Sequence, residues 1–143
     1  MVKGVIVEPG KQAKIAEVDP SLDGLQNLVD GYIEVIYPFE DPSMCLVCNE
    51  EAKLRGMELN RALRDSRHAV YDIVAGPFVV LGTCRGREGE EFCGLTEEQA
   101  NRARLAFLQP EMFIRLSRGG QILALTISEE EYAAGGRKIG GLL

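Results

Sequence analysis

The sequence predicts an α+β fold: a single domain with a largely antiparallel mixed sheet, two main helices on one face and a C-terminal hairpin. Two observations predict it. First, segments typical of β-strands outnumber the helical patterns, and the two kinds do not alternate in the regular order that builds a parallel sheet. Second, the 143 residues are the usual length of one domain and contain no linker, internal repeat or change in composition. We therefore expect residues 1–143 to form one domain.

The amino-terminal part of the chain predicts two strands, a helix and a third strand. Residues 2–7 and 14–18 are rich in β-branched or alternating apolar residues, and the turn sequence EPGK lies between them. The Asp-Pro pair at 19–20 is typical of an N-cap followed by proline at the first helical position. Apolar residues then fall on one helical face up to Gly31, which is expected to end the helix. Residues 32–37 alternate as a half-buried strand.

The middle of the chain predicts a hairpin, a short helix and a kinked strand. Residues 44–48 are expected to form a strand that enters the turn NEEA and returns from Lys53. The spacing of the leucines indicates a short helix over residues 60–67. A strong strand follows within residues 69–82, and the Gly-Pro pair at 76–77 is expected to kink it, because proline cannot donate to a ladder.

The carboxy-terminal part predicts a second main helix and a hairpin. The sequence TEEQ at 96–99 has the spacing of a capping box, and alanines, leucines and a phenylalanine follow at helical spacing. Residues 113–116 and 121–127 flank an Arg-Gly-Gly turn and are expected to pair as a hairpin. The hairpin is thus expected to form an extension at residues 109–128, followed by a mobile tail at residues 129–143.

Composition and charge limit the classes of function. Of the residues, 45% are hydrophobic and 27% are charged, and no apolar run approaches the ~20 residues of a membrane span, so no membrane partner is expected. The net charge of −6 disfavours general nucleic-acid binding. The apolar block at the amino terminus is too short for a secretory signal and no small-residue cleavage site follows it, so we expect a cytoplasmic protein.

Four blocks of the chain carry a resemblance to a known family. They are, in order, GVIVEPGK, LQNLVDGYIE, NEEAKLRGMELNRA and DIVAGPFVVLG. In order and spacing they resemble the domain of unknown function family numbered 3846, over residues 4–108. The resemblance implies a small cytosolic accessory protein of phages and mobile elements with no established activity. Ala52 departs from the pattern, because the family usually has glycine there, and the final hairpin lies beyond the matching part.

The four cysteines are weak candidates for a zinc site: Cys45, Cys48, Cys84 and Cys93. A zinc ribbon needs two close pairs, and only the first pair has the short spacing. Cys45 and Cys48 are three residues apart in an expected strand and so point to opposite faces. Cys84 and Cys93 flank a polar loop and could approach each other across a hairpin. We expect small buried residues rather than metal ligands, and no metal or other cofactor.

One group of polar residues is the candidate ligand-binding site: Asn49, Glu50, Glu51, Asn60 and Arg61. Amide, carboxylate and guanidinium groups at the end of a core strand could hold the hydrogen-bonding edge of a ligand or a phosphate. In the alternative interpretation, Asn49 only forms the turn and Arg61 pairs with a nearby acid. Glu34 and Asp72 lie on expected strands and could be that partner.

Two further features concern basic residues. His68, the only histidine, lies in the polar stretch DSRHA, which is typical of a helix end, where a cation interacts favourably with the helix dipole. Four basic residues gather near the carboxy terminus: Arg115, Arg118, Arg137 and Lys138. This basic end could receive an acidic partner, including another copy of the chain in a homo-oligomer.

The leading hypothesis is a non-enzymatic binding module of phage or mobile-element type, which binds a host protein or a small anionic ligand. Its basis is the family resemblance together with the lack of a complete set of catalytic residues. One alternative is a small hydrolase that uses Glu50 or Glu51 with Arg61. Another is an acidic mimic of DNA, which would need carboxylates arrayed along one face with the spacing of a duplex.

Overall fold

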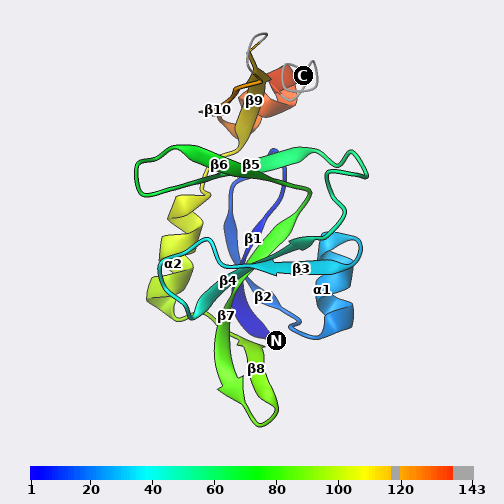
Figure 1. Ribbon diagram of the computed structural model, residues 1–143, viewed down its shortest axis with the longest axis vertical. Coiled ribbons are helices and arrows are strands. Elements are labelled where there is room, and N and C mark those ends of the chain that lie inside the picture. Colours follow the sequence, from blue (N-terminus) through cyan, green and yellow to red (C-terminus); the bar gives the residue numbers. More distant parts are fainter. Residues whose placement is uncertain (117–119, 137–143) are drawn as a thin grey trace.

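A six-stranded antiparallel sheet forms the centre of the molecule (Figure 1). The computed structural model describes residues 1–116 and 120–136. The strand order is β2-β1-β7-β4-β3, and β8 pairs with the far end of β7 as a protruding hairpin. The strands are β1 (Val2–Val7), β2 (Lys14–Val18), β3 (Ile33–Ile36), β4 (Met44–Asn49), β7 (Phe78–Gly86) and β8 (Gly89–Cys93).

Two small sheets lie at one end of the central sheet, one beyond the other (Figure 1). The first pairs β5 (Leu59–Arg64) with β6 (Val70–Ala75), and the second pairs β9 (Glu111–Arg115) with β10 (Ile122–Thr126). Every pairing recorded among the described residues is antiparallel. The predicted α+β class and the predicted C-terminal hairpin are therefore confirmed.

The two main helices pack on opposite faces of the central sheet, not on one face as expected. The helix α1 (Leu22–Val29) buries Leu25 among residues that include Cys45 and Val47 of β4. The helix α2 (Glu97–Ala106) and Phe107 pack with the alternate residues of β4, namely Met44, Leu46 and Cys48. All six residues of β4 are buried. A strand that is apolar on both faces needs a cover on each side, which one layer of helices cannot provide.

The helix ends agree with the sequence in part. The capping box of α2 is confirmed, because the Thr96 side chain accepts the Gln99 N–H and the Gln99 side chain accepts the Thr96 N–H. The N-cap of α1 is Ser21 rather than residue 19, and Asp19 instead accepts the Ser21 N–H at 3.0 Å. The left-handed residue that ends α1 is Asp30 (φ 61°), one position before the expected glycine.

The middle of the chain differs most from its prediction. Residues 60–67 do not form a helix, because β5 occupies most of this segment and pairs with β6. Asn60 to Leu63 are all buried, which a surface helix cannot achieve with consecutive residues. No strand returns from Lys53, since residues 51–57 form a compact turn in which the Arg55 N–H bonds the Glu51 carbonyl. The expected kink at 76–77 is a full break, at which β6 and β7 enter different sheets.

The segment after β10 continues as ordered structure. Residues 129–136 were expected to lie in a mobile tail, but they form the short helix α3 (Glu129–Glu131) and a π-helical turn, Tyr132–Gly136. Tyr132 is buried beside Gly10, and its hydroxyl donates to Glu58 Oε2 at 2.6 Å. Residues 117–119, in the expected turn of the hairpin, and 137–143, in the expected tail, lie outside the described residues. No helix in the described part of the chain has the length and apolar character needed to cross a membrane.

Candidate functional site

Asn49 connects the end of β4 to the carboxyl end of α1. Its Nδ2 donates to the carbonyls of Val29 at 3.0 Å and Asp30 at 3.1 Å, and its Oδ1 accepts the Glu51 N–H at 2.7 Å. These helical carbonyls have no partner inside the helix, so a buried amide that satisfies them fixes the helix to the sheet. The buried side chain of Asn49 is thus fully occupied, while Glu50 and Glu51 are exposed in the turn that follows.

Asn60 and Arg61 lie elsewhere, inside the protein. Asn60 Nδ2 donates to the carbonyls of Val7 and Gly76 at 2.9 and 2.8 Å. Arg61, with no exposed surface, donates to the carbonyls of Phe107 at 3.1 Å and Lys11 at 2.5 Å. Burial lowers the pKa of Arg61 to about 10, so the guanidinium remains charged at neutral pH. Both side chains join β5 to distant backbone segments.

The expected polar cluster therefore falls into two parts, and Arg61 is held by carbonyls instead of an acid. Its expected partners have other contacts: Glu34 accepts a weak hydrogen bond from the Cys48 thiol, and Asp72 forms an ion pair with Lys53 at 2.7 Å. Ligand binding at the turn after β4 stays a prediction. The hydrolase alternative, which needs Arg61 beside Glu50 or Glu51, has no support in this arrangement.

The cysteines also separate. Cys45 and Cys48 point to opposite faces of β4, into different clusters of the core, and burial raises the pKa of their thiols to about 11 and about 12. Cys84 and Cys93 lie on the paired strands β7 and β8, and burial together with a hydrogen bond to Cys84 raises the pKa of Cys93 to about 11. The described residues contain no group of three or more histidine, cysteine or acidic side chains placed to hold a metal ion.

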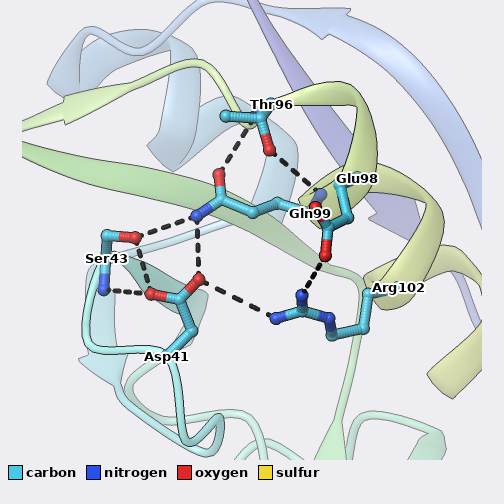
Figure 2. A network of polar contacts seen from close by, with 6 residues as sticks. All are labelled: Asp41, Ser43, Thr96, Glu98, Gln99 and Arg102. Carbon is cyan, nitrogen blue, oxygen red and sulfur yellow. Dashed lines mark hydrogen bonds and ion pairs between the residues drawn. The ribbon is translucent and has the colours of Figure 1, made fainter.

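A second polar network fixes the loop before β4 to α2 (Figure 2). Asp41 accepts hydrogen bonds from the Ser43 hydroxyl at 2.6 Å and from Gln99 Nε2 at 3.0 Å. Gln99 belongs to the capping box of α2, so one side chain both caps the helix and bonds the loop. The hydrogen bond from the Ser43 side chain contributes most, and together these hydrogen bonds lower the pKa of Asp41 to about 2. The groups in this network satisfy one another, which is typical of a structural network.

A broad groove lies between two hairpins of the described part of the chain. It occupies about 830 Å³ between the β5–β6 hairpin and the β9–β10 hairpin, and we call it the hairpin groove. Its floor is apolar and belongs to a cluster with the buried Phe113: Leu59, Ile73, Ile122 and Ala124. Exposed apolar side chains stand at its rim: Val70, Tyr71 and Leu123.

The hairpin groove is basic although the chain is acidic. Among the described residues, its lining includes three cationic side chains, Lys53, Arg64 and Arg115, together with His68 and one acidic side chain, Asp72. The whole sequence, by contrast, contains 22 acidic residues and 16 lysines and arginines. Lys53 is paired with Asp72 and Arg64 with Glu111, while His68 and Arg115 are exposed. The groove thus presents positive charge around an apolar floor.

The sequence alone predicts only part of the hairpin groove. The sequence indicates the basic character around Arg115. It also predicts a helix over residues 60–67, and this prediction misses the hairpin that carries Arg64 and His68. His68 was expected at a helix end; it instead lies in the β5–β6 turn with a positive φ of 63° and donates its N–H to the Asp65 carbonyl. No alternation reveals this hairpin in the sequence, because four consecutive residues of β5 are buried and its register with β6 is irregular.

Comparison with known proteins identifies the family of the core. Residues 2–108 match the model of a family described as a domain of unknown function, DUF3846. The chain belongs to this family. The resemblance seen in the sequence over residues 4–108 is thereby confirmed. The DUF3846 match ends before β9, so the family region supplies one wall of the hairpin groove and the hairpin extension supplies the other. Comparison with curated proteins and with solved structures found no match.

Proposed function

We propose that this DUF3846 protein is a non-enzymatic binding module of the cytoplasm, whose hairpin groove takes an acidic, amphipathic segment of a partner protein. The observation that carries the proposal is the reversed charge of the groove: basic side chains surround an apolar floor on a chain with a net charge of −6. A host protein of a phage or mobile element is the kind of partner that the family resemblance favours.

The composition of the groove favours a protein segment over a small anion. A small anion is held by several donors that converge on one point. Here two of the basic side chains are engaged by Asp72 and Glu111, and the remaining two are Arg115 and His68, from different hairpins. The apolar floor and the exposed Tyr71 instead offer the contacts that a longer amphipathic segment buries.

Peptide binding tests this proposal. The probe is a fluorescein-labelled amphipathic peptide of 16 residues in which leucines follow helical spacing and the polar positions are glutamate, compared with the same peptide carrying glutamine or lysine. We expect the glutamate peptide to bind best and its affinity to fall with salt. Reversing the charge of Arg115, as Arg115→Glu, is expected to weaken binding about tenfold, and introducing a negative charge by His68→Glu is expected to weaken it as well.

A matched control is Arg87→Glu, which makes the same change of charge in the exposed turn between β7 and β8, at the opposite end of the molecule (Figure 1). Arg87→Glu is expected to bind the glutamate peptide as the unmodified protein does. The proposal is wrong if Arg115→Glu and Arg87→Glu have equal effects, or if all three peptides bind equally. Displacement of the peptide by inorganic phosphate at the same affinity would assign the groove to small anions instead.

A further inference from the structure

The strand β3 presents an unpaired edge of the central sheet. Within the described residues, β3 is hydrogen-bonded to β4 alone and is the last strand in the sheet order. The Glu50 N–H bonds the Tyr32 carbonyl, and Glu34 and Ile36 lie opposite Cys48 and Leu46. In an antiparallel pair, inward and outward backbone groups alternate along the strand. The N–H and C=O groups of Ile33 and Val35 therefore point away from the sheet.

Two exposed tyrosines flank this edge. Tyr32 is 68% exposed and Tyr37 is 55% exposed, one on each side of the four residues of β3. Tyrosine offers a large, rigid contact area with a polar tip and is enriched in surfaces that recognise proteins. The edge and its two tyrosines lie within residues 2–108, so they belong to the DUF3846 region and not to the hairpin extension.

A small acidic pocket lies beside the same edge. It occupies about 130 Å³ between β3, the turn after β4 and β6. At ~30 Å³ per water molecule, the volume of the pocket equals that of about four waters. The pocket can therefore hold one long side chain but not a drug-sized ligand. Its walls are apolar: Ile36, Cys48, Ile73, Val74 and Ala75. Its charged lining consists of Glu34, Glu50, Asp72 and Lys53.

The charge of this pocket fits a cation. Of its three carboxylates, Asp72 is paired with Lys53, so Glu34 and Glu50 remain to attract a positive group. Apolar walls below an acidic rim suit lysine in particular, because its four-carbon stem packs on apolar surface while the ammonium group stays at the rim. A second copy of the chain is a poor occupant, since pairing β3 with β3 would bring two Glu34 carboxylates to one place.

We propose that β3 binds an extended lysine-containing segment of a partner protein by strand addition, with the lysine side chain in the acidic pocket. Added strands gain affinity from backbone hydrogen bonds and specificity from pockets for alternate side chains. A residue of the added strand that lies opposite Glu34 points to the same face as Glu34, toward the pocket. The acidic pocket shares Lys53, Asp72 and Ile73 with the hairpin groove, but the strand edge and the carboxylates of Glu34 and Glu50 do not line that groove. The proposal therefore does not depend on the function proposed for the groove.

The test uses a fluorescein-labelled nine-residue peptide of alternating threonine and valine with a central lysine, and the full chain labelled with ¹⁵N. We expect the amide signals of Ile33 and Val35 to shift on binding. Replacing the central lysine by glutamate is expected to weaken binding at least about tenfold. N-methylation of the two valines next to the lysine is expected to abolish binding, because it removes the backbone donors of the added strand.

The matched variants are Glu34→Lys and Glu17→Lys, which make the same change at exposed positions of the two outer strands, β3 and β2. Only Glu34→Lys is expected to weaken binding of the lysine peptide. Equal binding of the lysine and glutamate peptides, undiminished binding of the N-methylated peptide, or signal shifts confined to β2 or the hairpin groove would each overturn the proposal. The peptide comparisons use the unmodified protein, so they hold whether or not a variant folds.

Discussion

Arg64 Nη2 donates to Glu111 Oε2 at 2.7 Å, and this ion pair joins β5 of the family core to β9 of the hairpin extension. Glu111 Oε1 also accepts the backbone N–H of Ala62 at 3.1 Å. Glu111 is only 4% exposed. One buried carboxylate thus takes the place of a backbone ladder between β5 and β9, and it holds together the two hairpins that form the groove.

Loss of this carboxylate should destabilise the protein. In Glu111→Ala the Ala62 N–H and the Arg64 guanidinium both lose their partner inside the protein, and an unsatisfied buried donor costs about 1–3 kcal/mol. We expect the free energy of unfolding to fall by about 2–4 kcal/mol in urea denaturation. Arg115→Ala, an exposed position of the same strand, should change it by less than about 0.5 kcal/mol. Equal effects of the two variants would contradict the assigned role of Glu111.

Arg61 is predicted to stabilise the fold. In Arg61→Met the carbonyls of Lys11 and Phe107 lose their donor inside the protein, so we expect a loss of roughly 3 kcal/mol in the free energy of unfolding. The control is Arg67→Met, at an exposed position of the β5–β6 turn, which should have little effect. If Arg61→Met were as stable as the unmodified protein, the arginine would have to be retained for another reason, such as ligand binding.

Asn49 and Glu50 should respond differently to isosteric changes. Asn49→Asp replaces an amide donor by a carboxylate that faces two carbonyls at the negative end of α1. We expect it to lower the free energy of unfolding by roughly 2–4 kcal/mol. Glu50→Gln alters an exposed side chain and should change it by less than about 0.5 kcal/mol. Thermal and urea denaturation of both variants measure this difference, which would be absent if Asn49 only formed a solvent-exposed turn.

Asp41 should make stability depend on acid pH. Hydrogen bonds from Ser43 and Gln99 lower its pKa from 3.8 to about 2, so its ionised form stabilises the folded state above about pH 4. This contribution is lost as the pH falls from about 4 to about 2. Asp41→Asn is therefore expected to lower the melting temperature at neutral pH, by an amount that shrinks toward about pH 2. Glu17→Gln, at an exposed position of β2, serves as the control, and a constant difference across this range would refute the assignment.

The cysteines should stabilise the core by packing and not through a metal. Cys45→Ala and Cys48→Ala each remove a buried sulfur, so we expect losses of about 1–2 kcal/mol in the free energy of unfolding. A chelator should leave the melting temperature unchanged, because the two thiols face opposite sides of β4. Cys84→Ala, at an exposed position, is the control. Zinc in equal amount to the purified chain would contradict this prediction.

Local signals in the sequence predicted local structure well. The capping box at 96–99 and the strands β1, β3, β4 and those of the final hairpin are confirmed, because each depends on residues that are close in the chain. The segment 60–67 was misassigned, since two leucines four residues apart fit both a helix and an irregular strand. The bulges in β5 conceal its alternation, and pairing with β6 determined the outcome.

The sequence by itself determined the α+β class, the family, the two capped helices and the opposite orientation of Cys45 and Cys48, because these follow from local periodicity and composition. Only the tertiary structure decided that the helices cover opposite faces of the sheet and that Arg61 is buried on carbonyls. It also decided that Arg64, His68 and Arg115 surround one groove. The physical reason is that burial and contact between distant segments depend on how the strands are ordered, and strand order is set by the packing of the whole chain.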